Sequence, residues 1–232
     1  MNTEITDHIF LHFIKKFQYK NVAEIGVYGG NLTGRVVSSK DCPVENYYCV
    51  DPWVPYWLEI YGKDPGAEND PRLTLEWWEN IAQKVYKIQE KYPVVKIVRM
   101  RSAEGAKYLQ SQGVKLDFVY IDGKHTGQAM ILDLYHWLPL IKDDGMIGGH
   151  DYVSAYKDMT SVIDKTFGDD LNLIILDESK SSMAHKNTGQ GGNWWVFLNK
   201  ESKMKSIKSL EDNYPDGLKD DYKRATVPWI RA

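Results

Sequence analysis

Two groups of polar residues, each following a predicted strand, carry side chains suited to catalysis. Asp122 and His125 belong to the segment D-G-K-H, which follows the apolar run L-D-F-V-Y-I. His150 and Asp151 follow a short strand predicted over residues 146–149. The carboxyl ends of neighbouring parallel strands meet at one edge of a sheet, so we expect these four side chains to face the same cleft.

Two carboxylates and two imidazoles at one edge suit two kinds of chemistry. A hard divalent cation would take Asp122 and Asp151 as ligands, with His150 as the third. Alternatively, His125 or His150 would act as the general base that removes a proton from a hydroxyl. A structural interpretation also stands, since these residue types cap helices and bond to the backbone. Adjacent strand residues point to opposite faces, so His150 and Asp151 share a site only if the strand has ended before them.

A glycine turn earlier in the chain predicts a ligand site. Residues 21–33, N-V-A-E-I-G-V-Y-G-G-N-L-T, indicate a buried strand, a tight turn and the start of a helix. The turn glycines are Gly26, Gly29 and Gly30. Glycine lets a ligand approach the backbone, and a helix start offers free N–H groups. The dinucleotide fingerprint fails, because Tyr28 and Asn31 occupy two of its glycine positions, and no P-loop lysine follows. A plain strand-to-helix turn is the alternative.

Two further strand ends fit an adenosine. Asp51 follows the predicted strand over residues 46–50 and is placed to accept hydrogen bonds from a ribose diol. Its alternative role is that of a turn aspartate before a proline. The segment around Ser102, after the third predicted strand, could contact an adenine, although a helix N-cap explains Ser102 equally well.

The elements that must position these residues alternate between strand and helix. Strands are predicted over 22–25, 46–50, 94–100, 115–121, 146–149, 171–176 and 194–198, with helices between most of them. This alternation predicts an α/β fold with a mostly parallel sheet covered by helices on both faces. The last two strands are joined by a loop without a crossover helix, so we expect them to pair antiparallel at the sheet edge.

Composition bounds the class of protein. The 232 residues have a formal net charge of −3 and 43% hydrophobic residues, which predicts one globular domain and no electrostatic footprint for nucleic acid. No apolar run reaches the ~18 residues that a membrane span needs. The N-terminus carries acids and does not resemble a secretory signal. Two cysteines are too few for a disulfide framework, so a reducing cytoplasm is the expected location.

The quoted motifs together resemble a known family. A-E-I-G-V-Y-G-G followed by V-D-P-W resembles the class I S-adenosylmethionine-dependent methyltransferases. V-Y-I-D-G-K-H, W-L-P-L and G-x-I-x-G-H-D-Y are similar to the methyltransferase 24 family, which is itself similar to macrocin-type sugar O-methyltransferases. The resemblance covers about residues 20–155. It implies a Rossmann-like three-layer sandwich with a seven-stranded sheet and a reversed last strand.

The resemblance also implies roles for individual residues. The methionine portion of S-adenosylmethionine would contact Glu24, Gly26 and Gly30, the ribose Asp51, the adenine Ser102 and Ala103, and the sulfonium region Asp122. The full set of implied cofactor-binding residues is Glu24, Gly26, Tyr28, Gly29, Gly30, Thr33, Asp51, Trp53, Ser102, Ala103, Asp122, Gly123 and His125.

Two departures from the resembled sugar methyltransferases bear on the metal. Those enzymes hold Mg²⁺ with an acid at the Asp122 position and a pair of acids at positions 150 and 151. This chain has His150 in place of the first acid of that pair, and Lys124 where those enzymes carry a base. Mg²⁺ bound by Asp122, His150 and Asp151 therefore stays open.

The sequence therefore predicts an O-methyltransferase acting on a hydroxyl of a small molecule or sugar, with His125, His150 and Asp151 as catalytic residues. An NAD(P)-dependent oxidoreductase and a non-catalytic S-adenosylmethionine-binding module are the alternatives. We expect one methyltransferase domain over 1–200, with an N-terminal helix over 1–19, a lid loop over 177–193 and a polar extension over 201–232. A homo-oligomer is compatible with the sequence, and neither a nucleic acid nor a membrane partner is expected.

Overall fold

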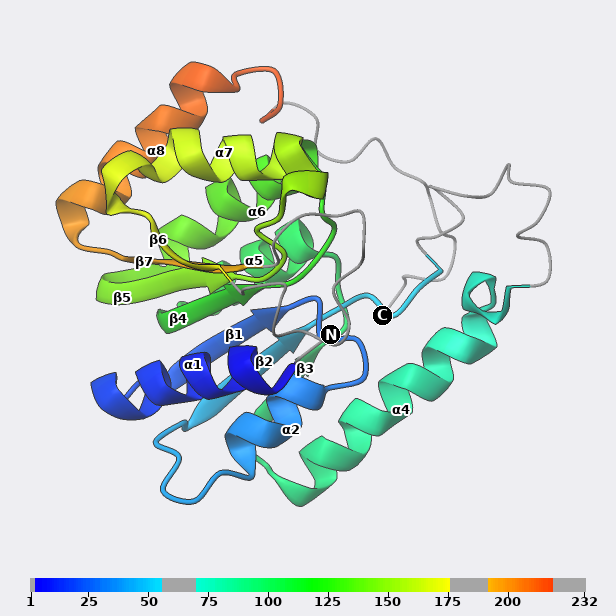
Figure 1. The fold of residues 1–232 in the computed structure, drawn as a ribbon. Helices are drawn as coiled ribbons and strands as arrows, with labels where there is room; N and C mark the ends of the chain where they lie inside the picture. The colour runs from blue at the N-terminus through cyan, green and yellow to red at the C-terminus, as the bar shows by residue number, and fades with distance from the viewer. Residues whose placement is uncertain (1–2, 56–69, 176–191, 219–232) are drawn as a thin grey trace.

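The computed structural model describes residues 3–55, 70–175 and 192–218. Its strands form one seven-stranded sheet between two layers of helices, as Figure 1 shows. Helices α5, α6, α7 and α8 cover one face, and α1, α2 and α4 cover the other. The predicted three-layer α/β architecture is confirmed.

The bounds of the elements lie close to those predicted. The strands are β1 (Asn21–Ile25), β2 (Asn46–Val50), β3 (Val95–Val98), β4 (Leu116–Ile121), β5 (Ile141–Gly149), β6 (Asn172–Ile175) and β7 (Gly192–Phe197). The helices are α1 (Thr3–Phe17), α2 (Asn31–Val37), α4 (Leu75–Lys91), α5 (Ser102–Ser111), α6 (Gly127–Trp137), α7 (Lys157–Phe167) and α8 (Lys200–Asn213).

The strand order is β3-β2-β1-β4-β5-β7-β6. The chain runs outward from β1 through β2 to β3, then returns to the other side of β1 with β4. Open α/β sheets bind ligands in the crevice where the strand order reverses in this way, at the carboxyl ends of the strands. The topology therefore puts a crevice above β1 and β4.

The last strand is reversed. β7 pairs antiparallel with both β5 and β6, whereas the pairs among β1, β2, β3, β4 and β5 are parallel. β7 therefore inserts between β5 and β6. A strand that returns without a crossover helix can only run back beside its neighbour, which confirms the predicted antiparallel last strand.

One strand begins earlier than predicted. β5 starts at Ile141, five residues before the expected position, and its pairing with β4 shifts register between Leu116 and Phe118. Asp144 lies in the shifted segment with φ 68°, just before Gly145. The turn signal in the sequence is thus a bulge inside the strand, since a bulge uses the same residue types as a turn.

Two segments predicted after residue 176 have different outcomes in the structure. The polar segment predicted as an extension after residue 200 begins as α8, whose Leu210 is fully buried in the core beside α6 and α7. The lid loop predicted over 177–193 lies outside the described residues, apart from Gly192 and Asn193 in β7. None of the helices within the described ranges is long and apolar enough to cross a lipid bilayer.

A buried polar cluster supports the start of the sheet. The Glu24 side chain in β1 is 3% exposed, and its Oε2 accepts hydrogen bonds from the Thr33 hydroxyl at 2.6 Å and the Tyr47 hydroxyl at 2.7 Å. Burial first, and then Glu24, raises the pKa of Tyr47 well above its usual value, so the phenol remains a donor. These bonds tie β1, β2 and α2 together beneath the glycine turn.

We expect Tyr47→Phe to lower the free energy of unfolding by about 1–3 kcal/mol, because the buried Glu24 carboxyl group loses one donor while staying desolvated. Urea denaturation measures this change. Tyr48→Phe is the matched control, since Tyr48 lies on the opposite, partly exposed face of the same strand. Equal losses in the two variants would contradict the role of this cluster.

Candidate active site

The register of the sheet lines up four of the predicted residues. Ile25 pairs with Val50 on one side and Ile121 on the other, and Ile121 pairs with Gly149. The residues that directly follow these positions are Gly26, Asp51, Asp122 and His150. They therefore stand in one row across the carboxyl edge of the sheet.

A pocket opens at this edge and encloses about 850 Å³ of space that includes open solvent. Its lining comes from the ends of β1, β2 and β4, the starts of α4 and α5, the loop before α6 and the middle of α6. The lining residues are Ile25, Gly26, Tyr28, Val50, Asp51, Pro52, Trp78, Arg101, Ser102, Asp122, Gly123, Lys124 and Asp133. The lining combines apolar side chains with a few converging polar groups, which is typical of small-ligand sites.

Two turn glycines are required by packing. Gly26 has φ 86°, and a Cβ there would lie 2.1 Å from the Asp122 carbonyl oxygen. Gly30 has φ 75°, and its Cβ would lie 2.9 Å from Ile88 of α4. Gly29 has no such constraint, since its nearest neighbour would be Lys84 at 3.8 Å. The turn therefore exists first to let β1 end against β4 and to seat α4 on α2.

Asp51 is held rigidly at the pocket wall. It is 8% exposed, and its two carboxylate oxygens accept the backbone N–H groups of Tyr28 at 2.9 Å and Trp53 at 2.8 Å. The buried Trp53 indole in turn donates to the Tyr28 carbonyl at 2.8 Å. Burial raises the pKa of Asp51 to about 6, against the lowering effect of these hydrogen bonds. Each oxygen keeps a lone pair for a ligand hydroxyl.

A second buried acid lies at another wall of the pocket. Asp133 on α6 is 3% exposed and accepts a hydrogen bond from the Ser102 hydroxyl. Ser102 Oγ accepts the Trp137 indole N–H at 2.8 Å. Burial raises the pKa of Asp133 to about 7, against the lowering effects of Ser102 and His125. The other carboxylate oxygen of Asp133, Oδ2, lies close to Gly123. A Cβ added to Gly123 would lie 3.8 Å from it.

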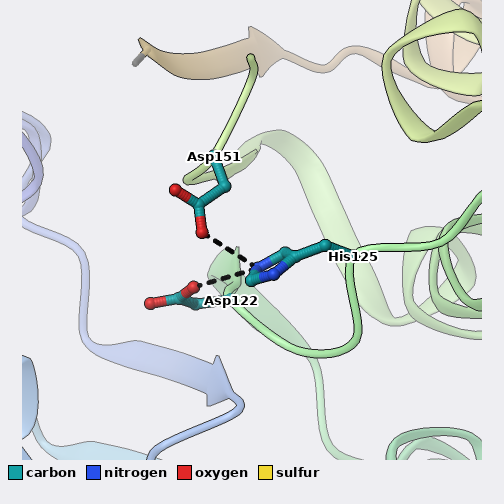
Figure 2. Close-up of side chains that lie close together, drawn as sticks. All are labelled: Asp122, His125 and Asp151. Atoms are coloured by element: carbon teal, nitrogen blue, oxygen red, sulfur yellow. Dashed lines mark ion pairs between the residues drawn. The ribbon is translucent and has the colours of Figure 1, made fainter. Parts of the chain in front are cut away.

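Three side chains meet beside the pocket. Figure 2 shows that Asp122 and Asp151 both point at the imidazole of His125, whose Nε2 lies 3.5 Å from Asp122 Oδ1 and 3.2 Å from Asp151 Oδ2. Burial alone would lower the pKa of His125, but the two carboxylates outweigh it and raise that pKa above its usual value. The His125 ring also stacks on Tyr156, with centroids 4.9 Å apart.

His150 stands outside this trio. Its Nδ1 lies 3.0 Å from Asp151 Oδ1, the carboxylate oxygen that His125 does not contact, and the residue is 9% exposed. The two neighbours reach one site because β5 has ended at Gly149 and Asp151 adopts φ 56°. His150 therefore positions Asp151 from behind.

Comparison with known proteins places this site in a family. The family profile described as a methyltransferase domain, of the methyltransferase 24 type, matches residues 23–152, which is more than half of the chain. The chain belongs to the methyltransferase 24 family. The matched range contains the glycine turn, both buried acids and all three side chains of Figure 2. Membership makes the protein a methyltransferase and removes the oxidoreductase alternative.

Solved structures share the fold of this methyltransferase at low sequence identity. An O-methyltransferase from Bacillus cereus in complex with SAH is 13% identical, with a TM-score of 0.57 over 85% of this chain and 81% of that one. TomG, an O-methyltransferase from Streptomyces achromogenes in complex with SAM, is 11% identical, with a TM-score of 0.56 over 84% and 80%.

Two further results complete the comparison. A ribosomal RNA methylase from Streptococcus thermophilus is 11% identical, with a TM-score of 0.52 over 83% of this chain and 96% of that one. No curated protein is related to the chain by sequence at a significant level. Identities this low establish a shared fold and leave the acceptor open.

The structure distributes the predicted site residues unevenly. Six of them line the pocket, namely Gly26, Tyr28, Asp51, Ser102, Asp122 and Gly123. Seven others that the resemblance implied do not line it, namely Glu24, Gly29, Gly30, Thr33, Trp53, Ala103 and His125. Glu24 and Thr33 bond to each other beneath the turn, and Trp53 braces Asp51. Their predicted cofactor contacts remain predictions.

The group of side chains that could hold a metal ion differs from the predicted ligand set in one residue. The described side chains that could jointly hold an ion are Asp122, His125 and Asp151, with ligand atoms within 4.8 Å of one another. His150 is not in this group, since its Nδ1 lies 3.0 Å from the other oxygen of Asp151, and its role as a third ligand stays a prediction. Sequence order alone could not choose between the two histidines.

Sequence reasoning missed several lining residues. Asp133 lines the pocket from the middle of α6 and Trp78 lines it from α4, and neither was assigned to the site from the sequence. Pro52, Arg101 and Lys124 line it from loops directly beside predicted site residues. For Asp133, a usable signal existed: an acid stands among buried apolar neighbours in A-M-I-L-D-L, and such an acid needs a partner or a function.

The buried acids predict how stability depends on pH. Asp133 has a folded pKa near 7 against an ordinary 3.8, so the folded state holds a proton that the unfolded state releases between those values. The contribution of Asp133 to the free energy of unfolding is therefore greatest below pH 4 and is lost as pH rises toward 7. One pKa unit corresponds to about 1.4 kcal/mol, so Asp133→Asn should reduce the loss of Tm between pH 5 and 8 by roughly 5 °C.

Calorimetric melting at the two pH values measures this effect. Asp169→Asn is the control, since Asp169 is exposed at the opposite edge of the sheet, just before β6. A wild-type pH response that Asp133→Asn leaves intact would refute the assignment of the response to Asp133.

Proposed function

We propose that this protein is an S-adenosylmethionine-dependent O-methyltransferase that acts on a hydroxyl of a small molecule or sugar. The observation that carries the proposal is the continuity of one pocket. Its wall includes a rigid acid suited to a ribose at Asp51, a polar pair at Ser102 and Asp133, and Asp122, which also belongs to the trio of Figure 2.

The residues present fit the cofactor. A ribose diol would donate to the two Asp51 oxygens, each of which is oriented by a backbone N–H. A purine would lie toward Ser102, where the Asp133 carboxyl group offers an acceptor for an exocyclic amine. The methionine end would then follow the Gly26 turn toward Asp122.

S-adenosylmethionine, when bound, supplies a methyl group on a sulfonium. The protein's part is to align the acceptor oxygen with that methyl carbon and to remove the hydroxyl proton. Asp122 spans both tasks, because it lines the pocket and contacts His125. His125 is the group placed to take the proton, and Asp151 stabilises the imidazolium that results.

A metal ion is the alternative use of the same residues, because His125 Nε2 cannot bind an ion and take the proton at the same time. Asp122, His125 and Asp151 are the described side chains that would hold it, and a bound cation would lower the pKa of the acceptor hydroxyl. This trio differs in one member from the Mg²⁺ set of Asp122, His150 and Asp151 predicted from the sequence.

Aromatic side chains at the pocket support a ring-shaped acceptor. Tyr28 is half exposed, and its ring lies 5.8 Å from Trp77 and 6.1 Å from Trp78. Aromatic faces of this kind stack on sugars and planar rings. A net charge of −3 argues against a nucleic-acid acceptor, although one structural neighbour is named a ribosomal RNA methylase.

We expect Asp51→Asn to weaken SAH binding about tenfold to a hundredfold, because a charge-assisted hydrogen bond to the ribose is lost. Binding to the wild type should also weaken as pH falls below 6, where Asp51 takes up a proton, and the variant should keep only the part of this dependence that Asp133 contributes. Isothermal titration of SAH at pH 7.5 and 5.5 measures both effects, with Asp169→Asn as the control. Absence of SAH binding to the wild type at millimolar ligand would refute the cofactor assignment.

We expect His125→Ala to reduce turnover by about 10²- to 10⁴-fold, the usual contribution of a general base, while SAH affinity changes less than about threefold. Release of SAH over a panel of phenols, sugars and sugar nucleotides measures turnover. His150→Asn, which keeps a donor toward Asp151, should cost less than about tenfold. SAH binding without methylation of any acceptor would instead favour a non-catalytic binding module.

A further inference from the structure

The Asp122, His125 and Asp151 side chains have the spacing of metal ligands. The distances from His125 Nε2 to the nearest carboxylate oxygens are 3.2 and 3.5 Å, and the three ligand atoms lie within 4.8 Å of one another. Bonds of about 2.1 Å to a common ion place neighbouring ligand atoms roughly 3 Å apart. Figure 2 shows both carboxylates and the imidazole converging from three directions.

The bonding of His125 points the same way. Its Nε2 is buried, and although two carboxylate oxygens are at ion-pair distance, neither contact is aligned as a hydrogen bond. The ring cannot easily turn away, because it stacks on Tyr156 with an interplanar angle of 28°. The nitrogen is thus directed at the space between two carboxylates, where a cation would complete its bonding.

His150 has a different role from His125. His150 Nδ1 contacts Asp151 Oδ1, which leaves Asp151 Oδ2 facing His125. A donor on the rear oxygen orients a metal-binding carboxylate and commonly accompanies such sites. His150 is therefore a positioning residue here, and the site offers one nitrogen and two oxygens.

This mixed donor set bears on which ion is bound. Mg²⁺ prefers oxygen ligands alone, whereas imidazole nitrogen favours first-row transition ions. Their affinities rise from Mn²⁺ to Cu²⁺ and fall again at Zn²⁺, which still binds more tightly than Mn²⁺. We propose that Asp122, His125 and Asp151 bind a divalent transition-metal ion in preference to Mg²⁺. Three protein ligands leave positions for acceptor oxygens, a role that rests on the proposed function, whereas ion binding itself does not.

The test is titration of the tag-free, EDTA-treated full chain with Zn²⁺, Mn²⁺ and Mg²⁺ by calorimetry, with Mn²⁺ also followed by electron paramagnetic resonance. We expect one ion per chain and at least about tenfold tighter binding of Zn²⁺ and Mn²⁺ than of Mg²⁺. Binding of Mg²⁺ as tightly as Mn²⁺, or no saturable binding of any of the three ions, would overturn the proposal.

Substitutions of the two histidines test whether the ion binds at His125. His125→Ala should weaken Zn²⁺ binding at least tenfold, and His125→Asp should reduce the preference for Zn²⁺ over Mg²⁺ by restoring an all-oxygen set. His150→Asn should keep the wild-type order of affinities, since it retains a donor to Asp151. Unchanged Zn²⁺ affinity in folded His125→Ala, verified by circular dichroism, would refute the site.

The same samples separate this inference from the proposed function. Titration with SAH reports on the pocket walls at Asp51 and Ser102, which none of these variants alters. SAH binding without ion binding would refute the metal site alone. Ion binding without SAH binding would refute the cofactor assignment and leave the metal site standing.

Discussion

The close approach of β1 to β4 at their carboxyl ends is the constraint from which the site follows. Gly26 lies so near the Asp122 carbonyl that a Cβ would come within 2.1 Å of it. The Gly26 N–H donates to Val50 at 3.0 Å, and the Asp122 N–H donates to Ile25 at 2.8 Å, so hydrogen bonding continues one residue past the strands. Because of this, Gly26, Asp51 and Asp122 emerge side by side.

Buried polar bonds then make the pocket rigid before any ligand arrives. Asp51 is bound by two backbone N–H groups, and Ser102 is bound between Asp133 and Trp137. Each set joins two elements that are distant in sequence and keeps a carboxyl group in a fixed orientation. A wall built in this way offers a ligand oriented acceptors without further loss of side-chain entropy.

Three residues of the crevice carry non-glycine left-handed backbone: Tyr28, Trp53 and Asp151. Such conformations cost free energy and persist where the surroundings enforce them, often at functional sites. At Tyr28 and Trp53, the Asp51 carboxylate and the Trp53 indole are the enforcing groups. At Asp151, the turn brings the carboxylate to His125 while His150 stays behind it.

The path of the chain explains why His125, and not His150, lies between the Asp122 and Asp151 carboxylates. Both imidazoles follow strand ends, but His150 is in register with Asp122 and packs into the edge of the sheet, where it is 9% exposed. His125 comes from the loop before α6, which returns over the edge and brings its ring against Tyr156. Loop geometry, rather than residue type, decides which nitrogen meets the carboxylates.

The sequence by itself determined the succession of strands and helices along the chain, the reversed last strand and the acids at the strand ends. It could do so because hydrophobic periodicity and turn residues are local properties. It also determined the family. Only the tertiary structure decided that Glu24 and Thr33 bond beneath the turn, that Asp133 reaches the pocket from α6, and that His125 rather than His150 joins Asp122 and Asp151. These outcomes depend on strand register, side-chain direction and loop path, which arise from contacts between residues far apart in the chain.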